Sequence, residues 1–147
     1  MFSSQIKKIN RFKKTSERYL VVSEKKIYKL DDKKSKVMRG ESLSDVVGMS
    51  CGAKDDQLVV IHMKNKNDLV ASLTSPPPGQ DWVGELAAAI ATAKQSSGSG
   101  DHFRVRVGDD IQCYMGSKHQ TIIIQQDPST NMPDFRSTKT GFVFTSP

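Results

Sequence analysis

The sequence predicts a mainly β fold, an antiparallel barrel or sandwich closed by one helix, which makes it α+β by helix content. Short runs of β-branched and aromatic residues recur about every ten residues, the spacing of hairpin-connected strands. Gly, Asn and Asp clusters separate these runs as turns. One later stretch has apolar residues at helical spacing. At 147 residues, the chain can bury a core without disulfides or metal.

Three strands are predicted in the first thirty residues. Residues 5–12 place two isoleucines among basic residues, and residues 18–23 are a run of β-branched and aromatic side chains. A turn at residues 24–25 leads into a third strand at residues 26–30. Residues 13–17 are polar and have no apolar anchor, so they are predicted to form a mobile connection.

Further strands follow a second turn at residues 31–35. They are predicted at residues 37–43, 46–51, 57–64 and 68–73. The segment TSPPPGQ at residues 74–80 ends this series, because consecutive prolines cannot donate hydrogen bonds to a sheet. We expect a stiff connector there, although polyproline II structure also suits an SH3 or WW partner.

One helix is predicted at residues 82–95, with Asp81 as its N-cap. Its larger apolar residues lie on one side at helical spacing, so this face should close an open end of the sheet core. These residues are Trp82, Val83, Leu86, Ile90 and Ala93.

The carboxy-terminal part is predicted to add strands to the same domain. The Ser- and Gly-rich residues 96–100 are a flexible linker, too short to mark a domain boundary. In HFRVRV, the Phe and Val side chains alternate with Arg and so occupy opposite faces. We expect residues 1–147 to form one domain, in which 101–147 pack on 5–95. The added strands are predicted at residues 103–107, 111–115, 121–126 and 141–145, with a polar loop at 127–134.

The positive charge belongs to the amino-terminal end. Residues 1–39 hold thirteen of the 22 Lys and Arg residues and four of the 16 acidic residues, a net charge of +9. The remaining 108 residues therefore carry −3 of the total of +6. Such asymmetry steers a protein toward phosphate-bearing partners, either lipid headgroups or nucleic acid. The alternative is that the basic surface only keeps the protein in solution.

The sequence lacks the common catalytic and nucleotide-binding motifs. It contains no GxxxxGK[ST], GxGxxG, GxSxG or HExxH pattern, so we expect no enzyme activity, no direct ATP binding, no cofactor and no metal site. The three histidines, His62, His102 and His119, lie on different predicted elements. His62 is expected to be a structural histidine whose hydrogen bonds are satisfied within a strand. The aromatic residues of the basic end form no RNP-like pattern, so nucleic acid is not an expected partner.

Cysteine use and hydropathy favour a cytoplasmic protein. Cys51 and Cys113 lie in separate predicted strands, and without a signal peptide they are expected to stay reduced, with one buried disulfide as the alternative. No apolar run approaches the roughly 18 residues of a membrane span.

Several short motifs occur together in a fixed order. They are Lys8 and Arg11, then residues 18–23 (RYLVVS), 27–30 (IYKL), 43–50 (LSDVVGMS), 55–62 (DDQLVVIH) and 67–70 (NDLV). In this order they resemble the tail homology 1 domain of class I myosins, whose core is pleckstrin-homology-like. The resemblance covers about residues 5–95, and the later strands fit it more loosely.

The resemblance implies a tail module that attaches a motor to acidic membranes as a peripheral protein. Its expected ligands are anionic lipids, namely phosphoinositides and phosphatidylserine. The first-strand headgroup ligand of this family corresponds to Lys8 and the second-strand ligand to Arg18. Arg11, Lys13 and Lys14 would line the connecting loop, while Lys7, Lys25, Lys26 and Lys29 would add diffuse attraction.

One departure from the family pattern concerns the second strand. The family has a basic residue, any residue and then Arg, whereas this chain has Ser16-Glu17-Arg18. The site therefore lacks one cation, and Glu17 is expected to weaken it. The chain also holds no motor, so actin or ATP activity is expected to come from elsewhere. A protein-interaction module that uses the sheet surface or the proline-rich turn is the alternative function.

Overall fold

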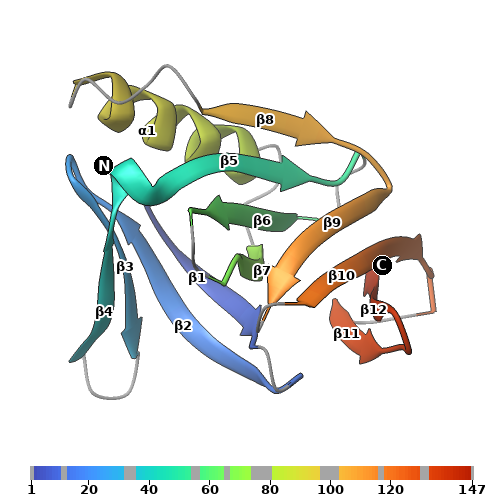
Figure 1. Ribbon diagram of the computed structural model, residues 1–147. Coiled ribbons are helices and arrows are strands. Elements are labelled where there is room, and N and C mark those ends of the chain that lie inside the picture. The colour runs from blue at the N-terminus through green and yellow to red at the C-terminus, as the bar shows by residue number, and fades with distance from the viewer. Residues whose placement is uncertain are drawn as a thin grey trace.

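The computed structural model describes residues 2–10, 13–31, 36–53, 57–64, 67–73, 81–96, 103–115, 118–129 and 133–146. These residues form an eight-stranded sheet, a four-stranded sheet and one α-helix, α1 (Trp82–Ser96) (Figure 1). The predicted mainly β fold with a single helix is therefore confirmed. The proline-rich turn at 74–80 and the linker at 97–100 lie outside the described residues.

The eight-stranded sheet has the strand order β4-β3-β2-β1-β7-β6-β5-β8. Its first seven strands in the chain pair antiparallel and are followed by α1, which is the pleckstrin-homology-like arrangement. Within the described residues, β4 and β8 remain edges and no closed barrel forms. The strands are β1 (Phe2–Ile9), β2 (Thr15–Val22), β3 (Lys26–Asp31), β4 (Lys36–Ser42), β5 (Val46–Cys51), β6 (Leu58–Met63), β7 (Leu69–Leu73) and β8 (Arg104–Val107), with a 3-10 turn, η1 (Leu43–Asp45), between β4 and β5.

The β1–β2 hairpin is longer than the sequence predicts. β1 starts at Phe2, and residues 15–17 belong to β2 rather than to a loop, since Thr15 pairs with Ile9 and Ser16 with Lys8. The prediction of a connection across these residues was wrong because backbone pairing with β1 forms a strand without apolar side chains.

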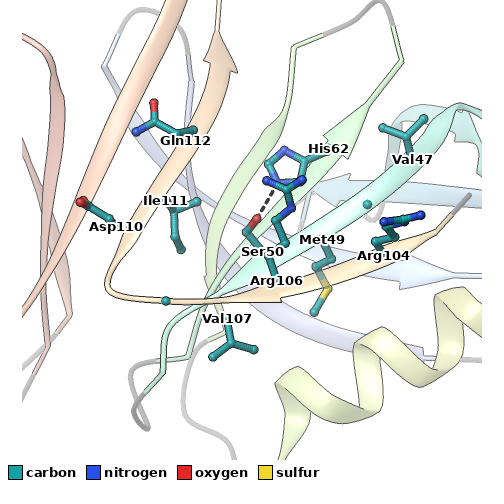
Figure 2. A pocket seen from close by; sticks show the side chains of 12 residues that line it. Val47, Met49, Ser50, His62, Arg104, Arg106, Val107, Asp110, Ile111 and Gln112 are labelled. Carbon is teal, nitrogen blue, oxygen red and sulfur yellow. Dashed lines mark hydrogen bonds between the residues drawn. The ribbon is translucent and has the colours of Figure 1, made fainter.

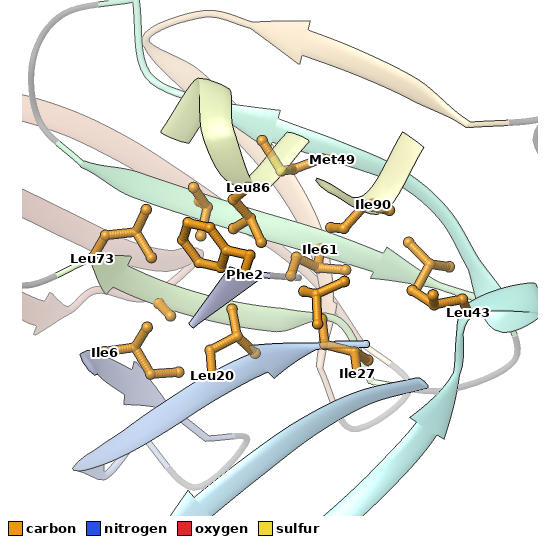
Figure 3. Close-up of a cluster of buried hydrophobic side chains, with 14 of the residues drawn as sticks. Phe2, Ile6, Leu20, Ile27, Leu43, Met49, Ile61, Leu73, Leu86 and Ile90 are labelled. Atoms are coloured by element: carbon orange, nitrogen blue, oxygen red, sulfur yellow. The ribbon is translucent and has the colours of Figure 1, made fainter. Parts of the chain in front are cut away.

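The main core lies between the curved larger sheet and α1 (Figure 3). Phe2, Ile6 and Leu20 come from β1 and β2, while Leu86 and Ile90 come from the helix. The predicted apolar face of α1 is confirmed, because Leu86 and Ile90 are buried and the remaining predicted residues also pack here. The N-cap is confirmed too, since the backbone N–H of Gly84 donates to Asp81 Oδ1 at 2.9 Å.

The four-stranded sheet packs on the other side of β1, β6 and β7. Its order is β11-β12-β10-β9, and β10 runs parallel to β12. A second core joins Ile9, Val60 and Val70 to Ile122 and Phe144 of this sheet. β11 was not predicted, because its polar sequence forms a strand only by pairing with β12. The strands are β9 (Asp110–Met115), β10 (Lys118–Gln126), β11 (Asp134–Ser137) and β12 (Gly141–Ser146).

Strand β8 extends the larger sheet parallel to β5, so the prediction of a wholly antiparallel arrangement does not hold there. Val105 and Val107 are 45% and 65% exposed. The alternating pattern therefore belongs to an edge strand whose valine side chains are exposed. Phe103, just before the strand, makes the contact with the main core.

Candidate functional site

Two of the predicted ligands, Lys8 and Arg18, lie on the same face of the β1–β2 hairpin. Arg18 is paired directly with Ile6, and residues opposite each other in antiparallel strands share a face. Lys8 shares that face because it is two residues from Ile6 along β1. Since Ile6 is fully buried in the main core, both cations continue the inner face of the sheet beyond the apolar side chains.

Lys29 joins these two residues, although the sequence predicts only a diffuse role for it. It is paired with Leu20 across β2 and β3, and Leu20 is buried in the same core. Burial lowers the pKa of Lys8, and the charges of Lys29 and Arg18 lower it further. Three strands thus bring together what we call the inner cationic cluster: Lys8, Arg18 and Lys29.

The inner cationic cluster has the electrostatic properties of an anion site. Lys8 is half-buried, and none of the described acidic side chains forms an ion pair with it. The Arg18 guanidinium is held by a hydrogen bond from its Nη1 to the carbonyl of Glu17 at 2.6 Å. Glu17 is paired with Lys7, and both side chains lie on the opposite face of the hairpin from the cluster. The position of Glu17 therefore gives no support to the expectation that its carboxylate weakens the site.

Lys7 and Lys13, in contrast, contact the four-stranded sheet. Lys7 Nζ forms an ion pair with Asp134 at 3.0 Å. Although partial burial raises the pKa of Asp134, the hydrogen bond and charge of Lys7 bring this pKa below its usual range. Lys13 Nζ donates to the carbonyl of Thr138 at 3.2 Å and lies 5.6 Å from the ring centroid of Phe142. These two lysines connect the sheets and do not reach the inner cationic cluster.

The other predicted basic residues are spread over the hairpins. Lys14 is exposed, and its backbone N–H donates to Asn10 Oδ1 at 3.1 Å. Arg11 lies outside the described residues. Lys25 and Lys26 are exposed at the β2–β3 turn, at the opposite end of β2 from the β1–β2 loop (Figure 1). The basic side chains that the structure describes at the amino-terminal end are therefore divided between separate parts of the sheet.

A second polar constellation was missed by sequence reasoning. Ser50 Oγ lies 2.7 Å from His62 Nε2, and His62 Nδ1 lies 2.9 Å from Asp68 Oδ2. This bears out the expectation that both His62 nitrogens are satisfied. Residue spacing carries no signal for this network, because it depends on the β5–β6 register, which pairs His62 with Gly48.

Cys51 and Cys113 are both buried and neither is in a disulfide, as expected for reduced cysteines. Burial, together with the charge of Asp68, raises the pKa of Cys113 to about 12, so this thiol is unreactive at neutral pH. In the described part of the chain, no three His, Cys, Asp or Glu side chains are grouped to hold a metal. Likewise, no described helix has the length and hydrophobicity of a membrane span.

Comparisons with known proteins identify the family and the relatives of this chain. Residues 1–146 match the Myosin TH1 family, described as "unconventional myosin tail, actin- and lipid-binding". Over 149 aligned residues, the chain is 38% identical to unconventional myosin-Ig of Homo sapiens and 32% identical to unconventional myosin-Id of Danio rerio. All of the chain is covered, but it spans only 14% and 15% of these relatives' lengths.

Among solved structures, the chain is similar to the hSac2 domain from human phosphoinositide phosphatase Sac2. The TM-score is 0.52 at 14% sequence identity, over 73% of this chain and 75% of that one. At this identity, the likeness concerns the fold alone.

Proposed function

The chain belongs to the Myosin TH1 family of unconventional myosin tails, and from this premise we propose that it is a non-catalytic module that binds acidic phospholipid membranes, with phosphoinositides as preferred ligands. The inner cationic cluster binds the headgroup, with Lys8 and Arg18 as direct ligands. In this role the chain is a peripheral membrane module on the cytoplasmic side. Phosphatidylserine would contribute through charge alone.

The observation that carries the proposal is the convergence of three cations on one half-buried face. Burial lowers the pKa of Lys8, and repulsion from the charges of Lys29 and Arg18 lowers it further. A phosphorylated inositol ring would remove this repulsion. Arg can donate two parallel hydrogen bonds to phosphate oxygens, and Lys acts as a compact charge, so the two residue types together suit such a ligand.

The remaining lysines contribute less specifically. A basic residue near an anionic leaflet adds about 1 kcal/mol, and this attraction falls off within a Debye length of roughly 8 Å at physiological salt. Lys14 is exposed at the end of the hairpin that holds Lys8, so it is proposed to add to headgroup binding. Lys25 and Lys26, at the opposite end of β2, are not.

A vesicle series at constant net charge tests the proposed lipid preference. Phosphatidylserine is replaced stepwise by one phosphoinositide at matched total charge, and cosedimentation of the chain is measured. A phosphoinositide headgroup carries several phosphates close together, which matches the three neighbouring cations of the inner cationic cluster. We therefore expect binding to rise with phosphoinositide content. Binding that depends only on total charge would contradict the headgroup assignment and leave the electrostatic attraction alone.

The pH dependence of binding tests the role of Lys8. Its pKa lies below the usual value of 10.5 in the free chain, and a bound phosphate would raise it. The positive charge of Lys8 is lost as pH rises through its lowered pKa, so binding should weaken over that range. On phosphatidylcholine vesicles containing a phosphoinositide, we expect a decrease of at most about tenfold per pH unit. Lys8→Arg should shift the decrease to higher pH, because Arg stays charged; identical profiles would contradict the prediction.

A protein-binding surface is a second candidate, favoured by the uncovered edge strand β8 with its exposed Val105 and Val107. The family description also names actin, so a role in actin binding belongs to this candidate and revises the expectation that such activity comes only from elsewhere. A chain that pellets with actin filaments but ignores the anionic vesicles would favour this function over lipid binding.

A further inference from the structure

A pocket of about 450 Å³ lies between β5, β8 and the start of β9 (Figure 2). Two strands, β6 and β7, separate β5 from β1 in the sheet, so this pocket is distinct from the inner cationic cluster. Its volume falls within the range of roughly 300–1,000 Å³ that is typical of small-ligand sites. The polar side chains that line it are Ser50, His62, Arg104, Arg106, Asp110 and Gln112.

Two arginines give this pocket its charge. Arg104 and Arg106 are two residues apart on β8 and therefore share a face, where they are paired with Gly48 and Ser50 of β5. Both are exposed, and neither forms an ion pair with any described acidic residue. Asp110 is the acidic residue among the lining residues, so the two arginines leave the lining with a net positive charge.

Gly48 keeps the pocket open beside these arginines. A Cβ atom at this position would lie 3.0 Å from the carbonyl oxygen of Arg104 and 3.7 Å from Cδ2 of His62. Any side chain here would therefore crowd the strand pairing and fill the space between His62 and β8.

The floor of the pocket is formed by side chains that are hydrogen-bonded to one another. Asp68, only 7% exposed, accepts from His62 Nδ1 and from the backbone N–H groups of Met63 and Tyr114. The carboxylate thus keeps the proton on Nδ1 and leaves Nε2 facing Ser50 Oγ. With the proton on Nδ1, Nε2 is an acceptor, and the Ser50 hydroxyl donates its hydrogen bond to it.

The same Ser-His-Asp order occurs in hydrolases, but the surroundings of Ser50 favour binding over catalysis. Ser50 is 5% exposed and lies within β5, paired with Val60 on one side and Arg106 on the other. Its backbone groups therefore take part in strand pairing, so its N–H is not available to stabilise an oxyanion.

We propose that this pocket is a second anion site, which binds the phosphate of a small phosphorylated ligand. Arg104 and Arg106 donate to the phosphate from β8, and the hydrogen-bonded Ser50 and His62 side chains form the floor below it. The same chemistry is offered by a membrane inositol lipid and by a soluble inositol phosphate. The site is independent of the inner cationic cluster and does not rest on its function.

The test uses the 147-residue chain carrying Lys8→Ala and Arg18→Ala, so that the cluster does not contribute. Inositol 1,4,5-trisphosphate is titrated while backbone amide NMR shifts are recorded. We expect saturable shifts at Gly48, Ser50, Gly108 and Gln112, and Arg104→Ala with Arg106→Ala should weaken the affinity by at least about tenfold. The matched control, Lys118→Ala with Arg136→Ala, removes the same charge from exposed positions outside the pocket lining.

A parallel arm uses phosphatidylcholine vesicles that contain a phosphoinositide. Vesicle binding that is lost on changing Arg104 and Arg106 would support the site and identify a lipid as the source of the phosphate. Binding of the soluble compound without vesicle binding would support the site and identify a soluble ligand. The absence of shifts around the pocket, or an equal loss in the control variant, would overturn the proposal whatever the outcome at the inner cationic cluster.

Discussion

Replacing Lys8 and Arg18 together by alanine is expected to weaken binding to phosphoinositide-containing vesicles by at least about a hundredfold. Each change removes a charge-assisted contact with a phosphate, and such contacts contribute about 1.5–3 kcal/mol each. Both side chains extend from the inner face of the hairpin at the margin of the core, so their removal creates no apolar cavity. Cosedimentation over a lipid titration measures the change in affinity.

The control for this variant is Lys25→Ala with Lys26→Ala. It removes the same charge from the same hairpin system, but at the opposite end of β2. We expect a decrease in binding of less than about tenfold, since these lysines can add only screened attraction. Equal losses in the two double variants would show that net charge, and not the inner cationic cluster, determines binding.

Replacing Asp68 by alanine is expected to lower the free energy of unfolding by about 3 kcal/mol or more. Its carboxylate accepts from His62 Nδ1 and from the N–H groups of Met63 and Tyr114 at 2.9–3.0 Å. Each buried donor left without an acceptor costs about 1–3 kcal/mol. Because Tyr114 belongs to β9, the variant should also loosen the contact between the two sheets. Urea denaturation measures the loss.

Asp134→Ala is the comparison for this stability effect. Asp134 also connects the two sheets, through Lys7, but its side chain is 66% exposed. Exposed ion pairs contribute about 0–1 kcal/mol, so this change should have a small effect. Asp68→Asn should be intermediate, because one oxygen remains to accept a hydrogen bond. If Asp68→Ala were no more destabilising than Asp134→Ala, the buried network would not stabilise the fold as we argue.

Elements with a strong local pattern could be predicted from the sequence. The strand at 46–51 and the helix after Asp81 form as expected, because β-branched runs, apolar periodicity and an N-cap act over a few neighbouring residues. Residues 15–17 and β11 could not be predicted in this way. They are polar segments, and only pairing with β1 and β12, respectively, makes them strands.

The mainly β class, the family resemblance and the choice of Lys8 and Arg18 as candidate ligands can all be read from the order of residues along the chain. Which cations accompany these two depends on the folded arrangement. It brings Lys29 into the cluster, and it directs Lys7 and Lys13 to the four-stranded sheet. It also assembles Ser50, His62 and Asp68. The physical reason is that strand register and sheet packing decide which distant residues meet, and both depend on the whole core rather than on any local run of residues.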